Sequence, residues 1–351
     1  MGLWFPGNER TIDMVKIALI GAGGIARAHA RCLRENPKAT IVGVMDTNRD
    51  AAEQLAAQHS ARVYDNFDEC LGEVDAVYVL TPPSFHSEYS VMAMEAGKHV
   101  LCEKPLATTV EDGEAMVDAA RRNGVKLMTG FNHRFQKCFR RLKEIVDSGC
   151  LGEIVSYWCQ RIGAGTPGQG NWRVDPELMC GMTVESLSHD IDLLRWMAGE
   201  VTSVSSAVYE SISALPGFDN NTTAVMTLAC GGSAVMHASW SSHLGRSSRG
   251  IIGTKGTAYL EGPSMPSSFH RSKWEFRTLR WKTADMEEAA EEELDETYWD
   301  IDSTYAAEND RFLDCVMSDC EPLMSGEDGL AALKISLAIL RSHREQAVVV
   351  L

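Results

Sequence analysis

The sequence lacks any long hydrophobic run. No apolar segment approaches the roughly 18 residues that indicate a membrane-spanning helix. The first residues, MGLWFPGNERTIDMV, also lack the basic start and the extended apolar core of a secretion signal. We therefore expect no membrane partner and a cytoplasmic location.

Cysteine pairs of the kind that bind zinc are missing as well. The chain has 10 cysteines but no C-x-x-C pair, and the closest two are Cys315 and Cys320. In a chain of this size without an export signal, free and buried thiols are the expected state. The sequence therefore predicts neither a disulfide framework nor a zinc cluster.

The chain is also poor in basic charge. Its 33 lysines and arginines face 49 aspartates and glutamates, which gives a formal net charge of −16. A nucleic-acid-binding protein needs a basic surface to displace counterions, so we expect no nucleic-acid partner. What remains is an ordinary globular composition, 44% hydrophobic over 351 residues, with length for about two domains.

Short apolar runs alternate with amphipathic segments in the first part of the chain. The runs are rich in Val, Ile and Leu without strict polar alternation, as expected for parallel strands covered on both faces. They span residues 15–20, 40–45, 74–80, 98–103 and 125–129. This alternation of strands and helices predicts a doubly wound parallel sheet of the Rossmann type over residues 15–135, after an extension at residues 1–14.

The pattern changes in residues 136–351. Segments that alternate in polarity or carry β-branched residues predict a larger, mostly antiparallel sheet. They span residues 152–162, 201–211, 222–230, 232–241 and 257–262. Helical patterns at 184–198, 304–317 and 326–344 are expected to cover this sheet. The fold class is therefore α/β, with an N-terminal parallel sheet and a C-terminal α/β domain that has a large open sheet.

A glycine-rich turn follows the first predicted strand. Gly21 can make the tight turn, Gly23 allows a pyrophosphate to approach the backbone, and Ala26 permits close packing of helix on sheet. Asp46 closes the second strand, where a carboxylate binds ribose hydroxyls and repels a 2′-phosphate. We therefore expect NAD to be preferred, while the nearby Arg49 leaves NADP open. The expected cofactor contacts are Gly21, Gly23, Gly24, Ile25, Ala26, Asp46, Thr47 and Arg49.

A second candidate segment is VLCEKPLATT, at residues 100–109. Its Lys104 falls at the carboxyl end of a predicted parallel strand, and ligands of doubly wound sheets bind outside that edge. Lys104 is therefore expected to face the nicotinamide, although a surface lysine is the simpler alternative. The segment TPPSFH leaves the neighbouring strand on the same side. Further cofactor contacts are expected at Thr81, Pro82, His86, Glu103 and Lys104.

A third cluster lies in GMTVESLSHDIDLLRWMAGE. If this segment is one helix, Glu185, His189 and Asp192 lie on one face. A carboxylate one turn from a histidine orients the ring and makes it more basic, as a general base requires. The alternative is a set of polar groups that cap or bridge packed elements. We expect no metal here, because a lysine in the same cleft would repel a cation.

These segments together resemble the Gfo/Idh/MocA family, named for glucose–fructose oxidoreductase, inositol dehydrogenase and a rhizopine-catabolism protein. The resemblance rests on GAGGIARAHA, TPPSFHSEYSVMAMEAGKHVLCEKPLA, GFNHRF, NWRVDPE and SHDIDLLRWMAG. It implies a Rossmann domain and a second domain whose open sheet forms homodimer or homotetramer contacts. It also implies NAD(P)-dependent oxidation of a ring hydroxyl of a sugar or cyclitol, or the reverse reduction.

The resemblance implies specific site residues. The catalytic set of the family corresponds to Lys104, Glu185 and His189, with Glu185 in place of the aspartate of the family and Leu187 in place of a frequent glycine. His189 would act as general base, assisted by Lys104. Positions lining the cofactor and substrate cleft are implied at Asn132, Arg134, Trp172 and Arg173. Of these, Trp172 and Arg173 would contact the cofactor, and the substrate contacts would be Lys104, Asn132, Arg134, Glu185 and His189.

Two other classes of protein share these features. Some relatives use the same hydride step for redox elimination and act as NAD-dependent glycosidases or lyases. Others bind a dinucleotide as non-catalytic sensors. The presence of both Lys104 and His189 argues against a pure sensor, which has no use for a base.

Overall fold

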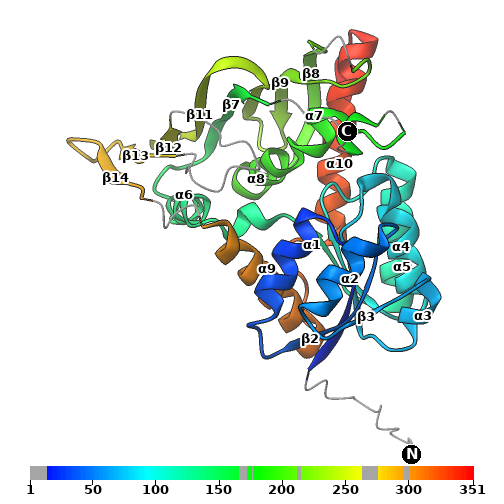
Figure 1. The fold of residues 1–351 in the computed structure, drawn as a ribbon. Helices are drawn as coiled ribbons and strands as arrows, with labels where there is room; N and C mark the ends of the chain where they lie inside the picture. The colour runs from blue at the N-terminus through cyan, green and yellow to red at the C-terminus, as the bar shows by residue number, and fades with distance from the viewer. Residues whose placement is uncertain (1–13, 166–171, 176, 212–214, 263–275, 296–299) are drawn as a thin grey trace, which may run out of the picture.

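A computed structural model describes residues 14–351 except 166–171, 176, 212–214, 263–275 and 296–299 (Figure 1). The predicted extension at residues 1–14 therefore lies outside the described residues, apart from Met14. Within the described part of the chain, no helix has both the length and the apolar character needed to cross a membrane.

The first sheet has six strands in the order β3-β2-β1-β4-β5-β6, all paired in parallel. The strands are β1 (Val15–Ile20), β2 (Ala39–Met45), β3 (Arg62–Val63), β4 (Ala76–Val79), β5 (His99–Glu103) and β6 (Leu127–Gly130). Strands β4 and β6 are buried along their whole length, which explains their continuous apolar sequence. The predicted doubly wound sheet is confirmed.

Helices on this sheet begin and end where the sequence provides caps. They are α1 (Gly24–Leu33), α2 (Arg49–Ala57), α3 (Phe67–Leu71), α4 (His86–Glu95) and α5 (Val110–Asn123). The side chain of Thr109 accepts a hydrogen bond from the Asp112 backbone at the start of α5, and Gly124 ends that helix with a positive φ of 63°. These caps fix the loops that leave the carboxyl edge of the sheet.

Within the described residues, the second sheet has nine strands in the order β14-β13-β12-β11-β7-β10-β9-β8-β15. They are β7 (Ile154–Ala164), β8 (Val201–Tyr209), β9 (Asn221–Leu228), β10 (Ser233–Ser239), β11 (Ser241–Gly253), β12 (Gly256–Gly262), β13 (Thr278–Thr283), β14 (Ala290–Glu293) and β15 (Val349–Val350). Only the β7–β10 pair is parallel, so the predicted mostly antiparallel sheet is confirmed.

The expectation that all three late helices cover this second sheet is wrong for one of them. Helices α8 (Ser188–Ala198) and α10 (Gly326–Glu345) pack on it, but α9 (Ile301–Ser318) returns to the first domain and packs against α1 (Figure 1). The buried Phe312, Leu313 and Val316 of α9 belong to the same apolar core as residues of α1, and partly exposed ion pairs border this contact. Arg31 donates to Asp302 at 2.6 Å, and Lys38 donates to Asp310 and Asp314 at 2.8 and 2.7 Å.

A buried ion pair joins the end of the first domain to the second. Arg134, in the short helix η2 (Asn132–Phe135), donates to both carboxylate oxygens of Asp192 on α8, at 2.8 and 2.6 Å. Its remaining nitrogen donates to the backbone oxygen of Leu323 at 2.8 Å. Burial raises the pKa of Asp192 to about 6 despite the Arg134 charge. This pair therefore fixes the position of α8, the helix that also carries His189.

Replacing Asp192 by alanine should strongly destabilise the protein, because Arg134 would lose its bidentate partner and remain buried with Asp328, 3.5 Å away, as its remaining acidic neighbour. We expect Asp192→Ala to lower the free energy of unfolding by about 3–5 kcal/mol, measured by urea denaturation. The matched control is Asp118→Ala, which breaks an exposed pair with Arg121 and should cost under about 1 kcal/mol. Equal losses in the two variants would contradict a structural role for the buried pair.

Candidate active site

The glycine turn after β1 has the geometry of a phosphate-binding loop. Gly21 has a φ of +107°, and a Cβ atom there would lie 2.7 Å from the Leu80 oxygen, so only glycine fits. Gly23 and Gly24 have open space on their Cβ side, and α1 begins at Gly24. The backbone can therefore be approached closely at the helix N-terminus. Ala26 is fully buried beneath it, whereas Ile25 is 39% exposed.

Asp46 supports this turn from the end of β2. Its two carboxylate oxygens accept hydrogen bonds from the backbone of Ala22 at 2.6 Å and of Asn48 at 2.7 Å. Thr47 and Arg49 follow on the exposed side. The Arg49 guanidinium pairs with Glu53 and Asp65. Its charge is thus already engaged by two acids, which weakens the case for Arg49 as a 2′-phosphate ligand.

His86 holds the ends of two neighbouring strands together. It is buried, and its ring nitrogens lie 2.8 Å from the Pro105 oxygen and 2.9 Å from the Thr81 oxygen. Burial lowers the pKa of His86. The sequence placed His86 and Thr81 among the cofactor contacts. The structure places His86 behind the segments that carry Thr81, Pro82 and Lys104, where it fixes their separation.

Lys104 reaches from the first domain to the second. Its Nζ donates to the backbone oxygen of Glu185 at 3.1 Å and lies 3.7 Å from the Glu185 carboxylate. Both side chains are largely buried, with 16% and 7% of their surface exposed. The two segments that sequence reasoning placed on either side of one cleft therefore meet, 81 residues apart in the chain.

Glu185 is also held by Arg173, from the short helix η3 (Trp172–Val174). Two guanidinium nitrogens donate to its two oxygens at 2.8 and 2.6 Å. The guanidinium lies over the Trp172 ring, 4.5 Å from its centre. Burial alone would raise the pKa of Glu185, but the charges of Lys104 and Arg173 outweigh it and lower the pKa. Glu185 is therefore an anion at neutral pH.

His189 lies in a compact aromatic setting at the start of α8. Its ring stacks on His133 with the centres 4.0 Å apart and the planes 11° from parallel. Its buried Nδ1 has no hydrogen-bond partner among the described residues. Burial, His133 and the positive charge of Lys104 together lower the pKa of His189 well below its ordinary value. The imidazole is therefore neutral at pH 7 and able to accept a proton.

The prediction that Glu185, His189 and Asp192 share one helix face is wrong. The helix is interrupted: α7 (Gly181–Glu185) ends four residues before His189, and α8 starts at Ser188. The cause is competition for backbone oxygens. Lys104 and the Ser188 hydroxyl donate to the Glu185 oxygen. Glu185 consequently faces Lys104 and Arg173, while Asp192 pairs with Arg134.

Sequence reasoning missed a buried charge network beneath His189. Asp190 accepts hydrogen bonds from Arg161 on β7 at 2.9 Å and from Arg249 on β11 at 2.8 Å. Both cations lower its pKa to about 2, against the effect of burial. Arg161 also donates to the Ser186 oxygen at 3.0 Å. An arginine inside an otherwise apolar strand pattern, as at Arg161, was the available signal.

Two of the expected substrate contacts, Asn132 and Arg134, are engaged with other protein groups at the junction between the domains. Asn132 is buried and donates to the Thr304 hydroxyl at 3.3 Å. Arg134 is buried in the pair with Asp192 and has 6% of its side chain exposed. Their positions favour a structural role at the domain junction. His133, which lies between them in the chain, is the residue that contacts the His189 ring.

Comparison with known families gives the class of this protein. Residues 15–131 match the model described as "Oxidoreductase family, NAD-binding Rossmann fold", and residues 139–259 match the "GFO/IDH/MocA C-terminal domain". The chain is thus an oxidoreductase with an NAD-binding Rossmann domain, in agreement with the open cradle at Gly23. It belongs to the Gfo/Idh/MocA family, as the motifs around Lys104 and His189 indicated.

The similar proteins include dehydrogenases named for glucose 6-phosphate, inositol and levoglucosan. Glucose-6-phosphate 3-dehydrogenase of Bacillus subtilis is 39% identical over 143 residues, which is 41% of each chain. Inositol 2-dehydrogenase of Rhizobium meliloti is 26% identical over 95% of this chain and 98% of its own. Levoglucosan dehydrogenase, solved with NADH and levoglucosan, has a TM-score of 0.84 at 21% identity and covers 96% of this chain and 99% of that one. This last likeness is one of fold.

The electrostatics of the site can be tested without a substrate. His189 should titrate at a lower pH than free imidazole, as followed by NMR of its ring protons. Lys104→Met should raise the pKa of His189, because it removes one of the charges that oppose protonation. Lys334→Met, on an exposed part of α10, is the control and should change nothing. An unchanged His189 titration in Lys104→Met would show that the two groups do not share a site.

Proposed function

We propose that this protein is an NAD-dependent dehydrogenase that oxidises a ring hydroxyl of a sugar, cyclitol or sugar derivative, reversibly. The observation that carries the proposal is the approach of Lys104 to Glu185, which brings the carboxyl edge of the nucleotide-binding sheet against the segment that contains His189. The names of the relatives, which include inositol, glucoside and levoglucosan dehydrogenases, support this substrate class.

His189 is the proposed general base. Its imidazole is kept neutral by burial and by the surrounding cations, so it can take the proton of the substrate hydroxyl. Stacking against His133 holds the ring in one plane. NAD, when bound at the glycine turn of Gly21 and Gly23, supplies the acceptor for the hydride. The site therefore separates proton and hydride onto two different groups.

Lys104 is the proposed electrostatic partner of the reacting oxygen. Its ammonium group, held by the backbone oxygen of Glu185, can donate a hydrogen bond to that oxygen and stabilise the developing alkoxide charge. Glu185 positions Lys104 and Arg173 and does not orient His189, which is a change from the role expected of a carboxylate on the same helix. Residues Trp172 and Arg173 form the adjacent wall.

Loss of either central residue should remove turnover and leave cofactor binding nearly intact. General base catalysis is typically worth about 10²–10⁴ in rate, so His189→Ala and Lys104→Ala should each lower kcat by that order. Activity is followed by the absorbance of reduced nicotinamide, with NAD and NADP, against inositols, aldoses, anhydrosugars and sugar acids. NAD affinity is measured by calorimetry, and Lys334→Ala serves as the control.

Near-full turnover in His189→Ala would remove this residue from the mechanism. Activity on a glycoside without added cofactor, together with tightly retained NAD, would indicate redox elimination instead of net oxidation. A preference for NADP would contradict the role given to Asp46.

The ten free cysteines are consistent with the proposed cytoplasmic location.

We also propose that the protein forms a homodimer or homotetramer through the second sheet. One face of this sheet is covered by α8 and α10. Val225 on β9, Val235 on β10 and Trp158 on β7 lie opposite one another in a row across the sheet, so their side chains share one face. Ile252 on β11 lies on the same face, two residues after the position opposite Trp158. Val225 is 51% exposed and Ile252 41%. Such an apolar row on a sheet is typical of a surface that another copy covers.

Light scattering should therefore give a mass at least twice that of the 38.6 kDa chain. Val225→Glu combined with Val235→Glu should shift the protein towards monomer, because charges would be buried in the contact. Lys334→Glu, at an exposed position on α10, should not change the mass. A wild-type protein that stays monomeric at millimolar concentration would contradict the proposal.

A further inference from the structure

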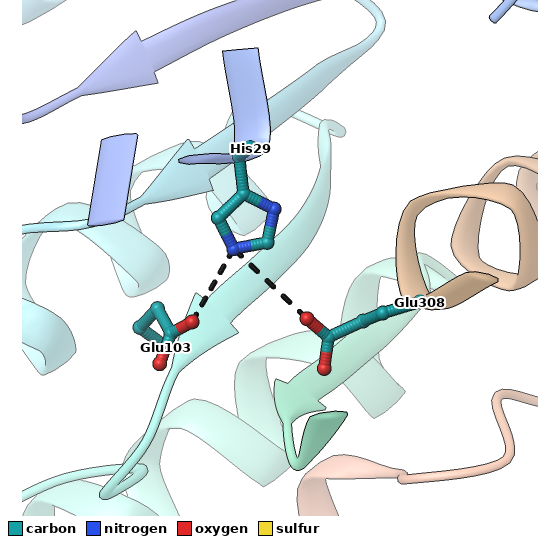
Figure 2. Close-up of side chains that lie close together, drawn as sticks. All are labelled: His29, Glu103 and Glu308. Carbon is teal, nitrogen blue, oxygen red and sulfur yellow. Dashed lines mark hydrogen bonds and ion pairs between the residues drawn. The ribbon is translucent and has the colours of Figure 1, made fainter. Parts of the chain in front are cut away.

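A cluster of three buried ionisable side chains lies behind Lys104. Figure 2 shows His29 from α1, Glu103 from β5 and Glu308 from α9 pointing toward one another. The Nε2 atom of His29 is 3.3 Å from a Glu103 oxygen and 3.9 Å from a Glu308 oxygen. The side chains of His29 and Glu308 are fully buried, and that of Glu103 is 8% exposed. The glycine turn and the catalytic residues leave this cluster unused.

The hydrogen bonds between His29 and Asn309 determine which ring nitrogen of His29 is protonated. Asn309 Nδ2 lies 3.5 Å from the His29 backbone oxygen and donates to it, which orients the amide. The amide oxygen of Asn309 then faces His29 Nδ1 at 2.7 Å, so Nδ1–H is the donor. The other nitrogen, Nε2, faces the two carboxyl groups. In a neutral imidazole with this tautomer, Nε2 would present a lone pair to oxygen lone pairs.

Glu308 is weakly compensated, because among the described residues it has the His29 ring at 3.9 Å but no hydrogen bond. Neither of its oxygens has a hydrogen bond among the described residues, and no lysine or arginine of the described chain pairs with any member of the cluster. The titratable groups that face it are His29, Glu103, Tyr78 on β4, Tyr305 on α9 and Cys32 on α1. The rings of Tyr78 and Tyr305 contact His29 edge-on. A charged Glu308 carboxylate without a hydrogen bond, beside the Glu103 carboxylate, would be very unfavourable in such a place.

We propose that His29, Glu103 and Glu308 form a buried proton-sharing cluster that positions Lys104, with one proton between His29 Nε2 and Glu103 and a second on Glu308 as an uncharged carboxylic acid. Two protons leave the cluster electrically neutral and remove the lone-pair repulsion at Nε2. Burial, reinforced by the Glu103 carboxylate, raises the pKa of Glu308 well above its ordinary value, which favours the protonated form of this side chain.

Protons fit this geometry better than a metal ion. Ligand atoms about 2.0–2.2 Å from a divalent ion such as zinc stand closer together at a tetrahedral site than the separation of Glu308 from His29 Nε2, which is 3.9 Å. A metal also needs an entry path, and both of these side chains are sealed from solvent.

The link to Lys104 runs through Glu103. One oxygen of Glu103 faces His29, and the other accepts a hydrogen bond from the Lys104 backbone N–H at 3.1 Å. The cluster thus fixes the backbone from which the Lys104 side chain extends toward Glu185. His29 is a positioning residue in this proposal, which rests on the role of Lys104 in the proposed function.

The protonation of Glu308 can be read directly. Infrared spectra at pH 8 of protein labelled with ¹³C-carboxyl glutamate should contain a carboxylic-acid carbonyl band, and Glu308→Gln should remove it. Glu185→Gln is the matched control and should leave the band, because Glu185 is ionised. Glu308→Gln should keep a thermal midpoint close to wild type, since an amide replaces a neutral acid of the same shape. Absence of the band, or a stoichiometric metal that is lost in Glu308→Gln, would overturn the proposal.

The positioning role is tested through His189, which requires no substrate. His29→Leu removes the donor to Glu103 and should raise the pKa of His189 as Lys104→Met does, because Lys104 is displaced. His29→Gln keeps an N–H donor and should restore much of the original titration. With an active substrate, His29→Leu should lower kcat on the order of 10- to 100-fold, the loss expected from a displacement near 1 Å, with KM little changed.

An unchanged His189 titration in His29→Leu would overturn the positioning role. Circular dichroism of both His29 variants establishes that they are folded. Failure of the proposed function has a different signature: Lys104→Ala would then keep full turnover, while the infrared band still decides whether Glu308 carries a proton.

Discussion

The contact between Lys104 and Glu185 is the constraint on which the site depends. It is the point at which a loop from the parallel sheet meets a helix end from the open sheet, and it uses a backbone oxygen as well as a carboxylate. Because the Glu185 oxygen is engaged in this way, α7 ends at Glu185, and a new helix, α8, starts at Ser188 and carries His189. The interdomain contact therefore builds the site as well as closing it.

Buried charge surrounds this contact on every side, and each group is neutralised locally. Arg134 is matched by Asp192, Asp190 is held by two arginines, and Glu185 is shared between Lys104 and Arg173. Such pairs contribute little net stability compared with apolar packing, but breaking one is costly. Their value here is geometric, because they hold polar groups in a single arrangement around the neutral ring of His189.

Local sequence patterns were sufficient to predict the parallel sheet of the first domain, and they singled out the segments of Lys104 and Glu185, which the structure brings into contact. Apolar strands and capped helices announce themselves within a few residues, and the glycine turn and Lys104 occupy fixed places at strand ends. The helix break at Ser186 could not be predicted, because its cause is Lys104 and Arg161, which are distant in the chain. Strand β11 (Ser241–Gly253) was not predicted, because its first half is polar and largely exposed and lacks the alternation that marks a half-buried strand.

The return of α9 to the nucleotide-binding half has a consequence for how the chain is made. The six-stranded sheet is synthesised before its partners on α9: the acids that pair with Arg31 and Lys38, and the asparagine that holds His29, lie 271 to 280 residues further along the chain. During synthesis the surface of α1 that contacts α9 therefore stays exposed, although N-terminal domains generally fold first. The α1 side of the nucleotide-binding domain is therefore covered only after α9 has been translated.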